Sequence, residues 1–352
     1  MFSVLDMFTI GVGPSSSHTV GPMCAAQAFA SSLEESGAVS RVGRIRVVLY
    51  GSLSLTGLGH GTDRAILAGL EGNVPATVDT DYLLSVRERC AHDGTIHVNG
   101  TNAIAYDDDG DMVFDRWKRL APHPNGMRFQ AFDAQGNIID EQVWYSIGGG
   151  FIRRGRIDDA LISNHEQTPA SSQSPEDSGN DEAAEYGDGV PYPFVSCDGL
   201  IDLCRKHHLS IADVVWANET ARRSPQEVRD RLTRIWNVMS HCIDAGCASA
   251  TPTLPGGLDV PRRAPLMYRR LAANSDVLRR DRRISSALES SDSAWVALFA
   301  MSVSEENAGG GRVVTAPTNG SAGIIPAVLE YYWHFVESAD DEGVRTCLLY
   351  TS

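Results

Sequence analysis

Lysine is almost absent from this chain. Of its 352 residues only Lys118 and Lys206 are lysines, so arginine supplies nearly all of its 30 basic side chains. An enzyme that uses pyridoxal phosphate needs a lysine for the Schiff base. The two lysines stand in "RWKRL" and "CRKHH", among charged neighbours and with no glycine-rich phosphate loop nearby. The scarcity of lysine therefore argues against this class of enzyme.

Long apolar runs and excess positive charge are also missing. No stretch approaches the roughly 18 to 20 uninterrupted apolar residues that a membrane helix needs. The N-terminal "MFSVLDMFTIGVG" has no basic leader and carries Asp6 within its apolar run, so it is a poor signal peptide. The formal net charge of -15 opposes nucleic-acid binding, which depends on neutralising phosphates. We expect a cytoplasmic protein that binds neither a membrane nor nucleic acid.

The cysteines lack the spacing of a metal or disulfide motif. None of the 7 forms a C-x-x-C pair, and an odd number in a cytosolic chain is no disulfide framework. We expect mostly buried, reduced thiols. They are Cys24, Cys90, Cys197, Cys204, Cys242, Cys247 and Cys347.

The first half of the chain alternates strand and helix signals. A β-branched apolar run predicts a strand over 44–53, and helical spacing predicts a helix over 62–72. Residues 95–100 are typical of a strand, and 127–150, with an internal "AQGN" turn, are typical of a hairpin. We therefore expect an α/β sandwich domain over residues 1–163.

The second half has a different composition. Residues 164–190 are rich in Ser, Pro, Gly and acidic residues, which predicts a disordered acidic linker. Residues 191–352 show apolar residues at helical spacing, which predicts an all-helical domain. Within it, Ser224 and Glu227 form an N-terminal capping sequence, and Gly246 is expected to end that helix. The whole is an α+β protein of two domains.

The last predicted helix, residues 323–338, is strongly apolar and should need further helices to pack against. The chain instead stops soon afterwards, at "VRTCLLYTS". We therefore expect an incomplete helical domain, truncated at its C-terminus.

Four segments combine glycine with hydroxyls, histidine or asparagine where regular structure breaks. They are "GPSSSHT" (13–19), "GSLSLTGLGHGTD" (51–63), "YSIGGG" (145–150) and "GGGRVVTAPTNGSAG" (309–323). A fifth, "LPGGLDVPRRA" (254–264), pairs two arginines with a loop, and its simpler interpretation is a solvated loop with exposed charge.

The run of three serines exceeds the need of one helix cap. One of Ser15, Ser16 and Ser17 is expected to cap the helix that follows. The surplus hydroxyls and backbone N–H groups suit a carboxylate or phosphate. His18 alone is a weak indication, since a lone histidine is more often a structural residue than a functional one.

The segment 51–63 follows a strand and precedes a helix, where loops of α/β domains present functional groups. His60 lies between two glycines, so packing explains it poorly, and a neutral imidazole is a natural general base. Thr62 and Asp63 are expected to cap the next helix, although Thr62 could also contact a ligand.

Two further loops are ambiguous. The glycines after Ser146 indicate a tight turn with positive φ, or close approach of a ligand to the backbone. Thr318 and Asn319 precede a helix and fit either a turn or a site, since Asn-Gly is turn chemistry.

Together these segments resemble the iron–sulfur-dependent L-serine dehydratases (L-serine ammonia-lyases) of the single-chain bacterial type. The resemblance rests on "DMFTIGVGPSSSHTVGPM", "YGSLSLTGLGHGTD", "GNVPATVD", "YSIGGGF", "PYPF", "LPGGLDVPRRA" and "EENAGGGRVVTAPTNGSAGIIPAVL". It runs from residue 1 to about residue 338, apart from the linker.

The resemblance implies an N-terminal domain related to regulatory serine-binding domains and a helical catalytic domain. It implies a [4Fe–4S] cluster with three cysteine ligands, acting as a Lewis acid on L-serine. His60 is then the first choice for the base and His18 the second. The expected substrate contacts are Ser15, Ser16, Ser17, Thr19, Thr62, Ser146, Gly148, Gly149, Thr318 and Asn319. An incomplete helical domain favours a homo-oligomer.

The chain departs from the family where the cluster should be held. Many members have a cysteine in the stretch where this chain has Ser321 and Ala322. Their other cluster cysteines lie around a C-terminal Gly-Cys-Gln motif that this chain lacks. No cluster ligand can be named, and the chain is expected to lack the cluster and to be inactive. The alternative function is a non-catalytic serine-binding regulatory module.

Overall fold

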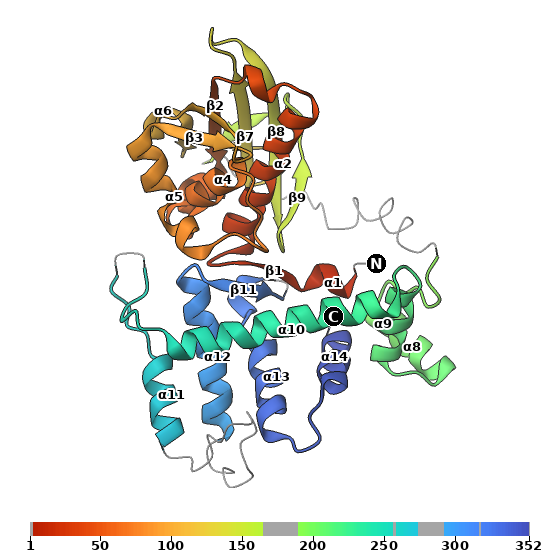
Figure 1. Cartoon of the computed structure of the whole chain (residues 1–352). Coiled ribbons are helices and arrows are strands. Elements are labelled where there is room, and N and C mark those ends of the chain that lie inside the picture. Colours follow the sequence, from red (N-terminus) through yellow and green to blue (C-terminus); the bar gives the residue numbers. More distant parts are fainter. Residues whose placement is uncertain (1–2, 165–188, 256–257, 274–291, 317, 352) are drawn as a thin grey trace.

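The computed structural model describes residues 3–164, 189–255, 258–273, 292–316 and 318–351. Figure 1 shows a sheet-rich N-terminal part above a helical C-terminal part. The mixed α/β first half and the helical second half are as the sequence predicts. Most of the predicted linker, residues 165–188, lies outside the described residues.

The N-terminal part is built on one mixed sheet in the order β3-β4-β2-β7-β8-β9. Its central strand β2 (Arg44–Tyr50) pairs antiparallel with β7 (Gly126–Phe132) and parallel with β5 (Met112–Asp115). The other strands are β3 (Thr95–Val98), β4 (Asn102–Ala105), β8 (Ile138–Gly148) and β9 (Phe151–Arg154). The predicted strands and the hairpin are confirmed, except that the strand predicted over 44–53 ends at Tyr50, where helix α3 (Gly51–Thr56) begins.

Both faces of this sheet are covered. Helices α2 (Gly21–Glu35) and α4 (Thr62–Leu70) pack on one face, where Phe29 stacks on Phe129 with ring centroids 5.2 Å apart. Helix α5 (Thr80–Asp93) packs beside α4. On the other face, the pair β6 (Lys118–Leu120) and β10 (Leu161–Ser163) covers residues such as Tyr145. Residues 47–50 of β2 are buried in succession, so the strand contributes side chains to the cores on both faces.

Helix α10 (Pro225–Ala248) runs the length of the helical part, and most of the other helices of this part pack against it (Figure 1). The Ser224 hydroxyl accepts from the Glu227 N–H, so the predicted cap is confirmed. The prediction that Gly246 ends this helix is wrong. A Cβ there would lie 2.6 Å from the Ser302 carbonyl oxygen, so the glycine permits close helix packing. The other helices are α8 (Cys197–His207), α9 (Ile211–Thr220), α11 (Ala264–Ala273), α12 (Asp292–Ala308), α13 (Ile324–Phe335) and α14 (Asp341–Tyr350).

The predicted apolar helix is confirmed as α13, but α14 follows it and was not foreseen. Helix α14 packs on α9 and contributes Val344 and Leu348 to the core. The side chains of Ile324 and Val328 on α13 stay exposed. In the described ranges, no helix has the length and apolarity that a bilayer crossing requires.

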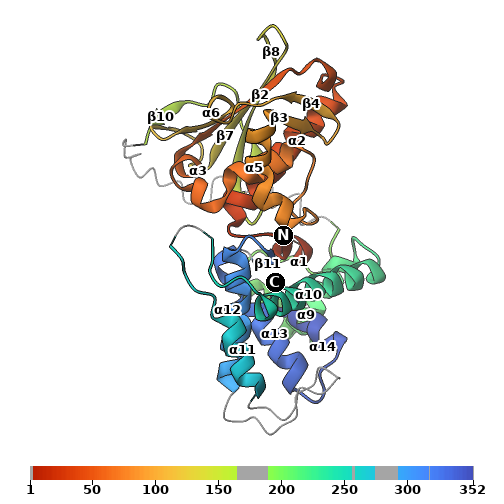
Figure 2. The same cartoon turned by 60° about the vertical axis from the view of Figure 1, so that its left-hand side comes forward.

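The N-terminal segment crosses into the helical part (Figure 2). Strand β1 (Thr9–Val12) pairs antiparallel with β11 (Arg312–Thr315), so the helical part is not all-helical as predicted. Helix α1 (Val4–Met7) precedes β1, and Val4 and Phe8 are buried in the same cluster as Trp236. The two parts therefore share one small sheet.

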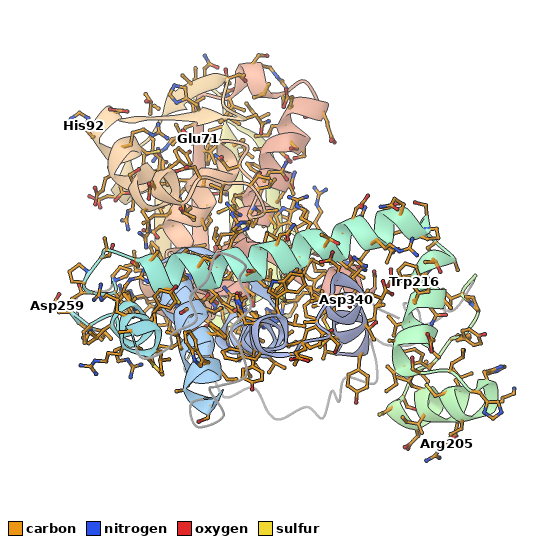
Figure 3. All side chains as sticks on the ribbon, turned by 60° about the horizontal axis from the view of Figure 1, so that its bottom comes forward. Glu71, His92, Arg205, Trp216, Asp259 and Asp340 are labelled. Atoms are coloured by element: carbon orange, nitrogen blue, oxygen red, sulfur yellow. The ribbon has the colours of Figure 1, made fainter. Side chains whose placement is uncertain are left out.

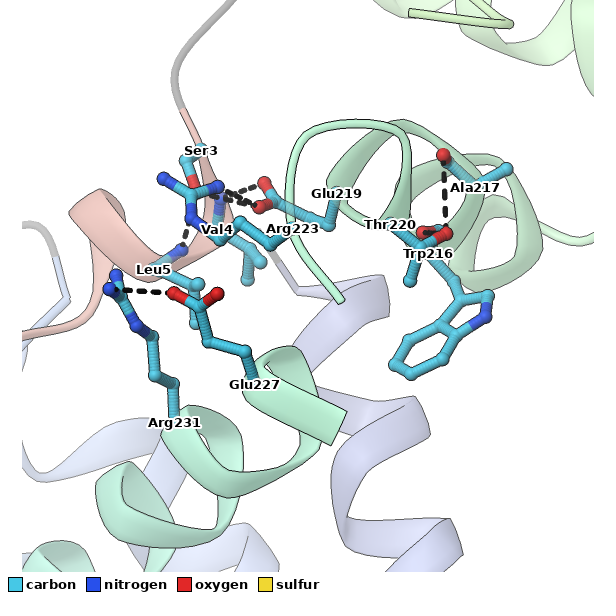
Figure 4. Close-up of polar contacts among 10 residues, drawn as sticks. All are labelled: Ser3, Val4, Leu5, Trp216, Ala217, Glu219, Thr220, Arg223, Glu227 and Arg231. Carbon is cyan, nitrogen blue, oxygen red and sulfur yellow. Dashed lines mark hydrogen bonds and ion pairs between the residues drawn. The ribbon is translucent and has the colours of Figure 1, made fainter. Parts of the chain in front are cut away.

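A buried carboxylate fixes this crossing segment (Figure 4). Glu219, on α9, accepts from the Ser3 hydroxyl at 2.9 Å and from the Val4 N–H at 3.0 Å. Arg223 neutralises the same carboxylate at 2.8 Å, and the Glu219 side chain is 7% exposed. Because the group is both paired and hydrogen-bonded, its burial is tolerated.

Replacing Glu219 by Gln should therefore destabilise the protein by about 1.5–3 kcal/mol, as expected when hydrogen bonds to a buried charge are lost. The matched control is Glu227→Gln, which breaks an exposed pair with Arg231 (side chains 42% and 51% exposed). The control should cost only about 0.3–0.5 kcal/mol. Urea unfolding monitored by circular dichroism gives both values, and equal losses would contradict the proposed anchor.

Candidate active site

The chain enters the candidate site directly from β1. Gly13 follows that strand, and a Cβ on it would lie 1.8 Å from the Asn307 carbonyl oxygen, so only glycine fits beside α12. The helical turn η1 (Ser16–Val20) comes next, and the Ser15 hydroxyl accepts from the His18 N–H at 3.2 Å. One serine is thus a cap, as predicted.

Hydroxyls hold both ring nitrogens of His18. Its Nδ1 lies 2.9 Å from Ser17 Oγ, and its Nε2 lies 2.9 Å from Ser52 Oγ. Burial and the neighbouring His60 ring lower the pKa of His18 below its ordinary value of 6.5. His18 is therefore a fixed, neutral ring with no nitrogen free for a ligand.

His60 has the opposite arrangement. Its Nδ1 lies 2.9 Å from the Thr56 carbonyl oxygen, which can only accept, so Nδ1 carries the proton. Its Nε2 then has a lone pair and no hydrogen-bond partner among the described residues. The two imidazole rings lie 4.9 Å apart, centroid to centroid. His60 also lines a cavity between the two parts, opposite Pro255 and Gly309.

The threonines support the histidine backbone. Thr19 Oγ1 donates to the His60 carbonyl at 2.8 Å, and Thr62 Oγ1 donates to the His18 carbonyl at 2.5 Å. The prediction that Thr62 and Asp63 cap the next helix is wrong. Gly61, at φ 64°, holds the N-cap position of α4, and Asp63 pairs with Arg87 instead.

The loop after β8 lies against the start of α2. Gly148, Gly149 and Gly150 all have positive φ, which confirms the predicted turn. Ser146 is fully buried, and its Oγ has no hydrogen-bond partner in the described parts of the chain. A Cβ on Gly21 would lie 2.1 Å from this Oγ, so glycine there leaves room for the hydroxyl.

The helical part contributes two asparagine side chains to this region. Asn319 Nδ2 donates to Asn307 Oδ1 at 2.8 Å, and Asn307 Nδ2 donates to the Pro14 carbonyl at 3.0 Å. Asn319 Oδ1 is buried and unpartnered among the described residues. Thr318 is exposed and contacts Ser321 in its own turn, so the structure does not bring it to the histidines.

Two neighbours of the histidines were not singled out from sequence. Ser52 contacts His18, and Arg64 lines the cavity with His60. Ser52 could have been found as a hydroxyl in the loop that carries His60. Nothing in the sequence marks Arg64 as a site residue, because it lies within a regular helical pattern.

The cavity continues past Gly309 to Arg262. Arg262 is only 8% exposed and pairs with Glu306 at 2.6 Å, so the interpretation as a solvated loop is wrong at this residue. Arg263 is exposed, as that interpretation expects.

The cysteines do not match a cluster site in the described residues. No group of three or more His, Cys, Asp or Glu side chains there could hold a metal ion. All seven thiols are free, but only Cys90 and Cys242 are buried, so the expectation of mostly buried thiols is wrong. Burial raises the pKa of Cys90 to about 12 and that of Cys247 to about 11, so both metal-free thiols stay protonated near neutral pH.

The lowered pKa of His18 has a consequence for stability. As the pH falls below 6.5, His18 is protonated in the unfolded chain but stays neutral in the folded chain. The free energy of unfolding should therefore decrease as the pH is lowered. The largest slope from one group is about 1.36 kcal/mol per pH unit. Urea unfolding of wild type and His18→Asn between about pH 7.5 and 5.5 checks this. The difference between the two curves should shrink toward low pH, and parallel curves would contradict a lowered pKa.

Each of the two parts matches a separate protein-family model. Residues 3–156 match the family model of the serine dehydratase beta chain, and residues 206–352 match that of the alpha chain. The chain is 44% identical to the L-serine dehydratase of Streptomyces coelicolor, covering 99% of this chain and 69% of that protein. It is 42% identical to L-serine dehydratase 1 of Escherichia coli, covering 97% and 68%.

These matches give no support to the expectation that the chain is a fragment, which stays a prediction. A third relative, the L-serine dehydratase of Mycobacterium tuberculosis, is 40% identical, covering 98% of this chain and 69% of that protein. Such identity over nearly the whole chain, with both family models in order, identifies the family. The chain belongs to the L-serine dehydratases.

Proposed function

We propose that this protein is an L-serine ammonia-lyase, which converts L-serine to pyruvate and ammonia. The observation that carries the proposal is the hydrogen-bonding state of the His60 ring. Its Nδ1 proton is held by the Thr56 carbonyl, and its Nε2 is left free in a side chain that lines the cavity between the two parts. A neutral imidazole with one accepting nitrogen is suited to remove a proton near neutral pH. Membership of the L-serine dehydratase family supports the substrate and the reaction.

The reaction begins at the α-carbon of L-serine. His60 Nε2 takes the α-proton, and the electron pair of that bond forms the Cα–Cβ double bond. The protonated His60 returns the proton to the β-hydroxyl, which leaves as water with the electron pair of the C–O bond. The resulting aminoacrylate tautomerises to an imine. Water then hydrolyses the imine to pyruvate and ammonia, so one water is lost and one is regained.

The other residues divide into two groups. Ser15, Ser17, Thr19 and Thr62 already hydrogen-bond to the histidine segments, so their role is to position His18 and His60. Asn319 Oδ1 is an acceptor without a partner among the described residues, which suits the substrate ammonium group. We place Ser146 and the backbone of Gly148 and Gly149 next to the substrate as well. Ser16 acts through its carbonyl, which accepts from the Gly21 N–H.

The family resemblance also implies a [4Fe–4S] cluster, which would supply a Lewis acid. The described residues hold no set of three cysteines for it, so no step above is assigned to a cluster. We propose a cytoplasmic protein with L-serine as its small-molecule partner.

The role of His60 is tested with His60→Gln and the control His92→Gln, whose side chain is 89% exposed at the outer end of the N-terminal part (Figure 3). Two readouts are compared. Pyruvate formation reports the whole reaction, and exchange of the L-serine α-hydrogen in D2O reports proton removal alone. His60→Gln should lower the exchange rate by about 10²–10⁴-fold, as expected for the loss of a general base, and should lower pyruvate formation in the same proportion in any preparation whose wild type forms pyruvate. Wild-type rates in His60→Gln would remove it as the base.

The alternative is the regulatory module, in which serine binds and no bond breaks. Calorimetric titration separates the two functions. L-serine binding by the wild-type chain with neither pyruvate formation nor α-hydrogen exchange would favour the regulatory module.

The cluster is tested separately. Iron and sulfide analysis after anaerobic reconstitution should give far less than one [4Fe–4S] cluster per chain, because the described thiols are scattered. A stoichiometric cluster would contradict this expectation.

A further inference from the structure

Three arginines line the cavities between the two parts, and two of them are engaged by the protein. Arg262 forms an ion pair with Glu306 at 2.6 Å. Arg312 donates to the Pro75 carbonyl at 2.8 Å and to the Val78 carbonyl. Arg64 has neither a hydrogen bond nor an ion pair with any described residue. It is therefore the cavity arginine whose guanidinium is available to a ligand.

Arg64 lies directly beside the proposed base. It is the third residue of α4, and side chains in a helix point back toward its N-terminus. A Cβ on Gly61 would lie 3.0 Å from Arg64 Nη2 and 3.2 Å from its Nε, so the guanidinium folds back over Gly61. Gly61 follows His60 in the chain, and both residues line the same cavity as Arg64.

The position of Arg64 does not stabilise the helix. A positive charge in the first turn of a helix is disfavoured by the helix dipole. The neighbouring carboxylate, Asp63, is paired with Arg87. The side chain is partly buried, so it gives up hydration without a protein partner in return. An anionic ligand in the cavity would supply the missing partner.

We propose that Arg64 binds the α-carboxylate of the amino-acid substrate and thereby selects substrates with a free carboxylate. The proposal rests on the proposed function. A guanidinium can hold a carboxylate through two parallel hydrogen bonds. In an α-amino acid the carboxylate is bonded directly to Cα, so its capture beside His60 brings the α-hydrogen to that base. The charge that develops when this proton leaves is shared with the same carboxylate.

The test compares two ligands that differ only at this group, L-serine and L-serinamide. Calorimetric titrations use wild type, Arg64→Gln, Arg64→Lys and the control Arg205→Gln. Arg205 is 78% exposed and lies at the outer end of α8, far from the cavity (Figure 3). A thermal melt of each variant confirms that it is folded.

Arg64→Gln should bind L-serine about 10- to 100-fold more weakly, as expected for the loss of a charge-assisted bidentate contact. Its affinity for L-serinamide should equal that of wild type, and Arg64→Lys should fall between wild type and Arg64→Gln for L-serine. Arg205→Gln should match wild type with both ligands.

Three other outcomes would overturn the proposal. If L-serine binds wild type and Arg64→Gln equally, Arg64 is not the carboxylate group and the proposed function stands. If Arg64→Gln weakens both ligands equally, the residue acts on the fold of the site rather than on the carboxylate. If wild type binds neither ligand, the proposed function fails together with this inference. Should Arg64→Gln not fold, Arg64→Lys carries the same comparison.

Discussion

The pairing of β1 with β11 is the constraint on which the candidate site depends. It fixes the residues just before Gly13 to the helical part, so the serine-rich turn that follows must start at the boundary between the two parts. The second segment with a histidine, residues 51–63, comes from the sheet and meets that turn through the His18–Ser52 contact. Asn307 and Asn319 complete the link from the helical side. The site thus joins segments that are hundreds of residues apart in the chain.

The two histidines are distinguished by what their nitrogens contact. Both ring nitrogens of His18 contact serine hydroxyls, whereas Nδ1 of His60 contacts a carbonyl oxygen. A carbonyl cannot donate, so it fixes the tautomer of His60, whereas a hydroxyl can donate or accept and fixes only the orientation of His18. Burial further keeps His18 neutral, which spares His60 a positive neighbour. The serine-rich segment 13–19 therefore mainly positions His18 beside His60, the proposed base.

Local patterns predicted the elements well and their contacts poorly. The β-branched apolar run of β2, the periodicity of α4 and the Ser224 cap are properties of neighbouring residues, so the sequence is enough to find them. The ranking of His60 above His18 as the base, made because glycines flank His60, stays a prediction. The β1–β11 pair joins residues 9 and 315, and no local pattern indicates such a pairing. Gly246 and Thr62 were misread for the same reason, since their partners, Ser302 and the His18 carbonyl, are distant in sequence.

The crossing N-terminal segment makes the two parts interdependent. Its strand, its buried Phe8 and its contacts to Glu219 belong to the core of the helical part, although the chain then continues into the sheet domain. If the backbone were cut between the two parts, the first piece would still donate a strand to the second, as in donor-strand complementation between subunits. The helical piece alone would lack the strand that pairs with β11 and the Val4 and Phe8 side chains of its core. The first piece thus completes the fold of the second, and the two would be expected to assemble from separate chains.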